Sequence, residues 1–254
     1  MSRGSIFFGW GALLWGGALA LMPPVSAFDT IVLETVTNGP TRIVAGNPKL
    51  ADARFPPAST FKMVLAWAAL ETKTASPAST FKVADSHVPG APRTLTLPEA
   101  MFYSSNDAFV ELAGRLPKER LEEFVAHSGF AGGPPPKDWL KEGFASVRRG
   151  GALRVTPRLE HAFILRVLRG ELASSKKIQD QLLACLAWPA ERATVRVYGK
   201  TGSLDAVRWF NGFGIEGKTD RAVTVLSVGA NATREDVVAA FYARFALPPP
   251  KLKE

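Results

Sequence analysis

Hydrophobic and polar residues alternate at both ends of the chain, whereas the middle of the chain follows a helical spacing. Residues 28–44 alternate on either side of Asn38-Gly39-Pro40, which predicts two strands joined by a turn. In residues 97–188 the apolar positions recur at helical spacing, and glycine and proline separate the successive helices. Three further strands linked by tight turns are predicted in residues 194–202, 209–217 and 221–229.

Three local patterns refine this division. The apolar run MVLAWAAL, residues 63–70, is continuous, so the helix that contains it is expected to be buried on all sides. Residues 131–136 (AGGPPP) predict a loop, and Thr233 with Asp236 predicts the capped start of a last helix over residues 235–246. Strands at both ends around a helical middle predict one α/β (α+β) unit, whose terminal segments share a sheet and whose middle helices form a second lobe.

The N-terminus has the features of an export signal. Arg3 precedes an apolar stretch over residues 6–22, and Val25-Ser26-Ala27 has the small-x-small pattern of a cleavage site. We therefore expect a signal peptide over residues 1–27, cleavage after Ala27, and a mature protein that is periplasmic or secreted. The stretch is also near the lower limit for a membrane span, so an uncleaved anchor is the alternative. No other membrane association is predicted.

Composition and charge exclude several other classes. With 254 residues, 46% of them hydrophobic, the chain has the composition of a folded globular protein. Its net charge of +8 is spread without a run of like charge, which favours a solvated surface over nucleic-acid binding. The single cysteine, Cys185, lies in an apolar run and is expected to be a core residue. The oligomeric state leaves no signal in the sequence.

The histidines and carboxylates predict neither a serine–histidine triad nor a metal site. His87, His127 and His161 lie in segments that contain no candidate nucleophile to pair with them. No cluster of possible ligands has the spacing of a metal site. Any catalytic chemistry is therefore expected to rest on other residue types.

The hexapeptide PASTFK occurs twice, at residues 57–62 and 77–82. In the first copy Ser59 and Lys62 lie three residues apart at the start of the buried helix, so they share one face of it. The helix dipole favours negative charge at Ser59, and the apolar surroundings favour the neutral, basic form of Lys62. A neutral amine beside a hydroxyl is one way to activate a weak nucleophile.

The second copy has a different sequel. Ser79 and Lys82 are followed by VADSHVPG, which predicts a loop leading into a short strand and no buried helix. Its lysine is expected to be solvated. We therefore interpret the repeat as a coincidence and assign the chemistry to Ser59 and Lys62.

Two more motifs follow the first copy in order. Ser104-Ser105-Asn106 is alone no more than a polar helix start, and Lys200-Thr201-Gly202 is alone no more than a turn. The ordered set S-x-x-K, S-x-N and K-T-G is much more specific. In these motifs the chain resembles the penicillin-recognising serine acyl-transfer superfamily, which contains serine β-lactamases, penicillin-binding transpeptidases and DD-peptidases.

Within that superfamily the chain is most similar to class D (oxacillinase-type) β-lactamases. The similarity covers residues 28–246, and four segments carry it: residues 54–72 (RFPPASTFKMVLAWAALET), 103–113 (YSSNDAFVELA), 137–143 (KDWLKEG) and 198–202 (YGKTG). The resemblance implies a single β-lactamase/DD-peptidase-like domain over residues 28–254. Its fold would be an antiparallel sheet flanked by terminal helices, with a helical lobe.

The resemblance also implies catalytic roles. Ser59 would be the nucleophile that opens a β-lactam, and Lys62 would be its general base. In class D enzymes this lysine is N-carboxylated, so a CO2-derived carbamate on Lys62 is expected as the one candidate prosthetic group. Trp139 would hold that carbamate through its indole N–H, and Leu140 would keep the pocket apolar. Ser104 would pass a proton to the leaving nitrogen.

Substrate binding follows from the same resemblance. A small-molecule β-lactam is the expected partner, and its carboxylate would be bound by Lys200, Thr201 and Arg234. The backbone N–H groups of Ser59 and Ser203 would form the oxyanion hole. Gly202, the last residue of the K-T-G motif, directly precedes Ser203 and would also line the substrate site. Loss of one oxyanion-hole donor typically costs about 3–4 kcal/mol of transition-state stabilisation.

Asn106 departs from the class D pattern, which usually has valine there. A lysine carbamate forms on the neutral amine and persists best in a dry, apolar pocket, whereas an amide adds polarity and could bond the amine directly. Without the carbamate, no obvious deacylating base remains. No Glu-x-x-x-Asn segment like that of class A enzymes follows the second motif, and Asp107 is expected to point away from Asn106.

Three functions therefore remain open. The leading hypothesis is a serine β-lactamase that hydrolyses antibiotics through an acyl-enzyme on Ser59. The alternative is a penicillin-binding acyl acceptor, either a DD-peptidase or a sensor-like domain, that deacylates poorly because of Asn106. The third is a non-catalytic binding domain that keeps the fold, against which the intact set of motifs argues.

Overall fold

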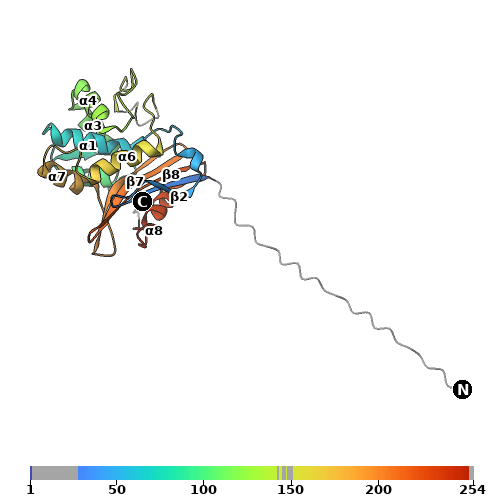
Figure 1. Ribbon diagram of the computed structural model, residues 1–254. Coiled ribbons are helices and arrows are strands. Elements are labelled where there is room, and N and C mark those ends of the chain that lie inside the picture. Colours follow the sequence, from blue (N-terminus) through green and yellow to red (C-terminus); the bar gives the residue numbers. More distant parts are fainter. Residues whose placement is uncertain (2–27, 142, 145–146, 148–150, 252–254) are drawn as a thin grey trace.

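The computed structural model describes residues 1, 28–141, 143–144, 147 and 151–251 (Figure 1). The predicted signal peptide falls almost entirely outside the described residues and stays a prediction. None of the helices in the described part of the chain combines the length and the apolar character that crossing a membrane requires.

The two ends of the chain meet in one antiparallel sheet. Its order is β2 (Arg42–Gly46), β1 (Asp29–Val36), β8 (Thr219–Val228), β7 (Val207–Glu216), β6 (Val195–Leu204) and β5 (Ala187–Trp188). β1 pairs with β8 along its whole length, from Asp29 opposite Val228 to Val36 opposite Arg221. This pairing confirms the predicted sheet shared by the terminal segments.

The two faces of the sheet bury different cores. On one face α8 (Arg234–Ala243) packs Phe241 against Phe210 of β7, with ring centroids 4.1 Å apart. Trp209 and Phe213 lie at odd separations from Phe210 along β7, so they point to the other face. There they join the core of the helical lobe. Figure 1 shows α8 on one side of the sheet and α6 (Pro157–Leu168) on the other. The period-2 pattern of the strands thus supports helices on both faces.

The helical lobe is built around α1 (Lys62–Glu71). The other helices of the described lobe are α2 (Leu97–Phe102), α3 (Asn106–Gly114), α4 (Lys118–Ser128), α6 and α7 (Lys176–Leu186). α1 contacts α3, α4 and α7, and every residue of α1 from its first to Leu70 is buried. The predicted all-round burial of this helix is confirmed, and it places Lys62 in the interior.

Two helix boundaries differ from the sequence pattern. The helical stretch after residue 97 is divided at residues 103–105, because the Ser105 hydroxyl accepts a hydrogen bond from Ala108 N and starts a new helix. The helix predicted to reach Trp188 ends at Leu186, since Trp188 pairs with β6 and its indole Nε1 donates to Gly199 O at 3.0 Å. Cys185 is buried as predicted, and burial raises the pKa of its thiol to about 12.

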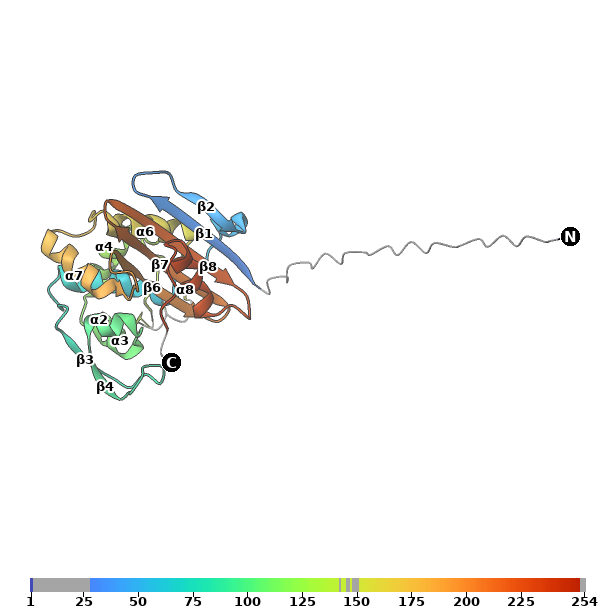
Figure 2. The ribbon, with the colours of Figure 1, turned by 90° about the horizontal axis from the view of Figure 1, so that it is seen from below.

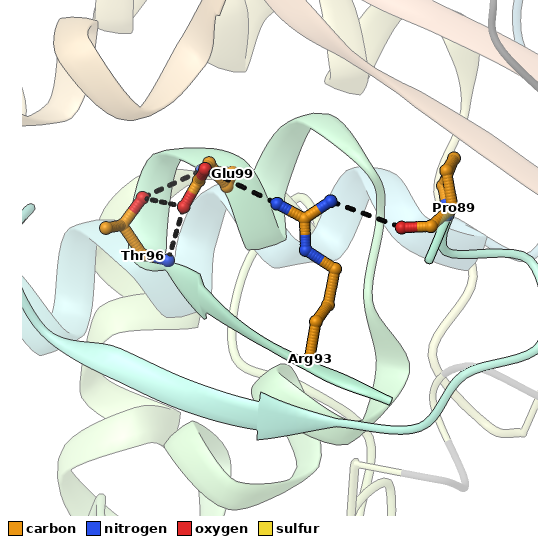
Figure 3. A network of polar contacts seen from close by, with 4 residues as sticks. All are labelled: Pro89, Arg93, Thr96 and Glu99. Carbon is orange, nitrogen blue, oxygen red and sulfur yellow. Dashed lines mark hydrogen bonds and ion pairs between the residues drawn. The ribbon is translucent and has the colours of Figure 1, made fainter. Parts of the chain in front are cut away.

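The second PASTFK copy enters a short hairpin of β3 (Thr80–Val83) and β4 (Arg93–Thr96), and Lys82 is exposed as predicted. Figure 2 shows this hairpin beside α2 and α3. A polar network fastens the hairpin to α2 (Figure 3). Thr96 N and Oγ1 both donate to Glu99 Oε2 at 2.7 Å, and Arg93 lies 3.9 Å from Glu99 Oε1. The hairpin is therefore a fixed support for the segment that follows α2.

Candidate active site

Ser59 lies in a 3-10 turn, η2 (Ala58–Phe61), that runs directly into α1. Ala58 has φ of 50°, a left-handed conformation that is unfavourable for a residue with a Cβ and is most often kept at functional sites. The turn is closed by Pro57 O, which accepts from Thr60 N at 3.1 Å and from Thr60 Oγ1 at 2.7 Å. The structure thus places Ser59 and Lys62 at the same end of α1, as the spacing predicts.

Lys62 joins the first motif to the second. Its side chain is 0% exposed, and Nζ donates to Ser104 O at 2.6 Å, Ser104 Oγ at 3.2 Å and Asn106 Oδ1 at 3.1 Å. The ring centroid of Phe109 lies 5.4 Å from Nζ. The direct bond between the Asn106 amide and the Lys62 amine, which the sequence left as a possibility, is therefore present.

The second motif is held by the segment that follows the second PASTFK copy. Ser104 has φ of 59°, and Asp85 fixes the next turn by accepting from Ser105 Oγ at 2.5 Å and Asn106 N at 3.0 Å. His87 Nε2 lies 3.2 Å from Ser104 O. No role in the site was predicted for this segment from the sequence. The carboxylate of Asp85 lies at the N-terminus of α3, where the helix dipole favours a negative charge.

The third motif completes the cluster from β6. Lys200 is 0% exposed, and its Nζ donates to Ser104 Oγ at 2.9 Å and to Thr201 O at 2.8 Å. Burial, together with the charges of Lys62 and Arg234, holds the pKa of Lys200 well below its usual range. Ser104 Oγ therefore lies between two buried amines, which makes a proton path between them geometrically available.

Arg234 reaches the same place from the first turn of α8. Its Nε donates to Thr201 Oγ1 at 3.2 Å, and its guanidinium lies 5.8 Å from the ring centroid of Trp188. Burial lowers the pKa of this guanidinium. Arg234 thus brings a positive charge, and Lys200 and Thr201 bring hydrogen-bond donors, to one place beside Ser104, an arrangement suited to binding a carboxylate.

Gly202 allows β6 to approach η2, the turn that holds Ser59. A Cβ at this position would lie 2.9 Å from Pro57 O and 3.1 Å from Thr60 Cγ2. β6 pairs with β5 at Val197 and Tyr198, and β6 also contacts η2. Ser203 is exposed next to this contact, and its part in an oxyanion hole stays a prediction.

Gly202→Ala is expected to destabilise the protein, because the added methyl group must push β6 and η2 apart. Overpacking of this kind typically costs about 1–3 kcal/mol of unfolding free energy. Thermal and denaturant unfolding of the variant measure it. The matched control is Gly114→Ala, since a Cβ there meets nothing within 4 Å. A loss of the same size in both variants would contradict the steric explanation.

Trp139 is buried near the start of α1, and its indole N–H has a protein partner. Its indole Nε1 donates to Glu122 Oε1 at 3.3 Å, and its ring packs edge-on against Phe61 with centroids 5.6 Å apart. The expected role of holding a carbamate on Lys62 stays a prediction, and it would require the indole N–H to leave Glu122. Leu140, its neighbour, is half-buried.

One buried acid beside the site was missed by the sequence reasoning. Glu160 on α6 is 0% exposed and contacts Thr60, the residue that follows Ser59. Its sequence signal was an acidic residue among the apolar positions of the predicted helix, in RLEHAFIL.

Comparison with known proteins relates most of the chain to one family. The family described as the penicillin binding protein transpeptidase domain matches residues 30–208. The class D β-lactamase BAT-2 superposes with a TM-score of 0.74 at 18% identity, over 87% of this chain and 92% of that one. The class D β-lactamase YbXI from Nostoc gives 0.72 at 21% identity, over 87% and 95% of the two chains. A class D β-lactamase from Bacillus subtilis gives 0.72 at 20% identity, over 87% and 92%.

Proposed function

Because the chain belongs to the penicillin-binding protein transpeptidase domain family, we propose that it is a serine β-lactamase that forms an acyl-enzyme on Ser59. The observation that carries the proposal is one hydrogen-bonded path, from Lys62 Nζ through Ser104 Oγ to Lys200 Nζ, beside the turn that holds Ser59. The fold, shared with class D β-lactamases, supports it. The export signal predicted in the N-terminal sequence would place the enzyme outside the cytoplasm.

Acylation needs a base, an oxyanion site and an acid for the leaving group. Neutral Lys62 would take the proton of Ser59 as its oxygen attacks the lactam carbonyl carbon. The N–H groups of Ser59 and Ser203 would stabilise the oxyanion. When the C–N bond breaks, Ser104 would give its proton to the lactam nitrogen and recover one from Lys62 or Lys200. Lys200, Thr201 and Arg234 would hold the substrate carboxylate.

The described surroundings of Lys62 do not fit an N-carboxylated side chain. Two of the atoms bonded to Nζ, Ser104 O and Asn106 Oδ1, are acceptors only, and they would repel the oxygens of a carbamate. The indole N–H of Trp139 is bonded to Glu122. We therefore propose that Lys62 acts as an amine without a carboxyl group, in acylation and in activating the water for deacylation.

Mass spectrometry of the protein mixed with a penicillin, sampled over time, tests the proposed function. A β-lactamase gives a transient adduct and continuing formation of hydrolysed penicillin. The absence of any adduct or product would contradict all acylation chemistry. An adduct that persists, with one penicillin consumed per protein and no hydrolysed penicillin released, would contradict hydrolysis and favour the second candidate.

The second candidate is a penicillin-binding acyl acceptor, a DD-peptidase or a sensor-like domain, that turns over β-lactams poorly. The bond from Lys62 Nζ to Asn106 Oδ1 favours it, because an amide oxygen stabilises the ammonium form, which cannot act as a base. Release of D-alanine from a peptide with that C-terminus would support the DD-peptidase form.

Asn106→Val is expected to speed deacylation, because it removes one acceptor of the Lys62 ammonium. A hydrogen bond to a charged group contributes about 1.5–3 kcal/mol. Its loss favours the neutral form of the amine, which is the form that can act as a base. Decay of the acyl-enzyme, followed by mass spectrometry, measures the effect. Ser105→Ala is the matched control in the same motif, since Ser105 bonds Asp85 and not Lys62. Slower decay in Asn106→Val would contradict the argument.

A further inference from the structure

Glu160 is a fully buried acid with neutral hydrogen-bonding partners. Its Oε1 lies 2.5 Å from Thr60 Oγ1, and its Oε2 accepts from Asn211 Nδ2 at 2.7 Å. Asn211 Nδ2 also donates to the backbone O of Glu160 at 2.8 Å. Both protons of the Asn211 amide are therefore committed to Glu160, and the remaining partner of the carboxyl group is the hydroxyl of Thr60.

The hydroxyl of Thr60 has one proton and two neighbouring acceptors. Thr60 Oγ1 lies 2.7 Å from Pro57 O and 2.5 Å from Glu160 Oε1. If the hydroxyl donates to Pro57 O and so closes η2, the proton between Thr60 and Glu160 must come from the carboxyl group. An ionised Glu160 would instead accept a hydrogen bond from the Thr60 hydroxyl. Pro57 O would then keep its bond from Thr60 N and lose the one from Thr60 Oγ1. The geometry of the turn is thus coupled to the protonation of Glu160.

The polar chain behind Glu160 has a consistent assignment of donors and acceptors when the imidazole of His161 is neutral. Asn211 Oδ1 accepts from Thr224 Oγ1 at 2.6 Å, so Thr224 Oγ1 is free to accept from His161 Nδ1 at 3.1 Å. His161 Nε2 then accepts from Thr35 Oγ1 at 2.9 Å, which requires a neutral imidazole. The chain connects α6 with three strands, β7, β8 and β1, and holds Glu160 in place.

The titratable groups around this chain support a neutral acid. Burial raises the pKa of Glu160 to about 8, against the lowering effect of its bonds to Thr60 and Asn211. Burial also lowers the pKa of His161 to about 4, although the charge of Glu34 on β1 opposes it. Glu34 is itself paired with Arg221 on β8. On the side of η2, Lys62 bonds the second motif.

We propose that Glu160 is a positioning residue for acylation, which as a neutral acid donates to Thr60 Oγ1 and so fixes the turn that presents Ser59. The inference rests on the proposed function of Ser59. It adds an alkaline limit to the reaction, because loss of the Glu160 proton releases the Thr60 hydroxyl from Pro57 O. Ala58, which has a left-handed φ of 50°, is the residue before Ser59 in the same turn.

Glu160→Gln separates the proton from the shape of the side chain. The amide N–H can donate to Thr60 Oγ1 and the amide oxygen can accept from Asn211 at every pH. The rate constant for acylation by a chromogenic cephalosporin is measured from pH 6 to 9.5 in wild type and variant. The ratio of wild type to variant removes the contributions of Lys62 and Lys200. It is expected to fall to about one-tenth of its low-pH value at pH 9, where a group of pKa about 8 is about nine-tenths ionised.

Two more variants complete the design. Glu160→Ala lacks the donor and is expected to acylate at least tenfold more slowly than Glu160→Gln at every pH. Glu216→Gln, an exposed change at the end of β7 that is paired with Arg192, is expected to keep the wild-type pH profile. A ratio of wild type to Glu160→Gln that does not change with pH would overturn the proposal. Absence of acylation in all the proteins would contradict the proposed function, and the inference would fall with it.

Thermal unfolding gives a readout that does not depend on activity. Because the pKa of Glu160 is raised from its ordinary 4.5, its contribution to stability is complete below pH about 4.5 and is lost as the pH rises to about 8. His161 acts in the opposite sense: its contribution to stability is complete above pH about 6.5 and is lost as the pH falls to about 4. Between pH 6.5 and 8 the midpoint of wild type should therefore fall relative to Glu160→Gln. Parallel midpoints would overturn the proposal.

Discussion

Ser59→Ala is expected to abolish acylation by every β-lactam, because it removes the oxygen that forms the ester. In serine hydrolases, loss of the nucleophile lowers kcat by on the order of 10^6. Labelling with a fluorescent penicillin, followed by intact-mass measurement, gives a direct reading. The fold should survive the change, since Ser59 Oγ is not among the hydrogen bonds that close η2.

Ser79→Ala is the matched control, because Ser79 lies in the identical hexapeptide. Its Oγ accepts from Ser76 N at 2.9 Å in a turn before β3, and the lysine of its own hexapeptide, Lys82, is exposed. Full labelling is expected in this variant. Label that is retained in Ser59→Ala and lost in Ser79→Ala would reverse the assignment of the two copies.

Lys62→Met is expected to slow acylation about 10^2–10^4-fold, the usual contribution of a positioned general base. Methionine has a similar length and no charge, so the buried site of 0% exposure should accept it. Ser104 would keep its bond to Lys200. Stopped-flow measurement of the acylation rate, with circular dichroism to verify folding, tests the expectation.

Lys200 is the other group able to act as the base, because burial lowers its pKa and Ser104 Oγ connects it to Lys62. Acylation of Lys62→Met within threefold of wild type would assign the base to Lys200. A matching loss in Lys200→Met but not in Lys62→Met would do the same. The expected pattern is a large loss in Lys62→Met and, in Lys200→Met, weaker binding of the substrate carboxylate.

The sequence was sufficient for the elements whose pattern is local. The strand and helix periods predicted the shared terminal sheet, the buried α1 and the capped start of α8. The motif spacing predicted that Ser59 and Lys62 would lie together, since three residues along a helix are one turn. The different sequels of the two PASTFK copies separated a buried lysine from an exposed one, as the structure confirms. These features depend on neighbours in the chain.

Contacts between distant segments required the fold. Asp85 and His87 follow the copy that the sequence set aside, yet the hairpin returns them to the second motif. Trp139 matches a motif, but its indole N–H meets Glu122. Glu160 reaches Thr60 across 100 residues. Side-chain partners at such separations are set by how helices and strands pack, and the free energy of each buried polar group depends on those partners. The order of the chain thus predicts which serine and lysine are the candidates for the reaction, while packing sets the protonation and the support of the groups around them.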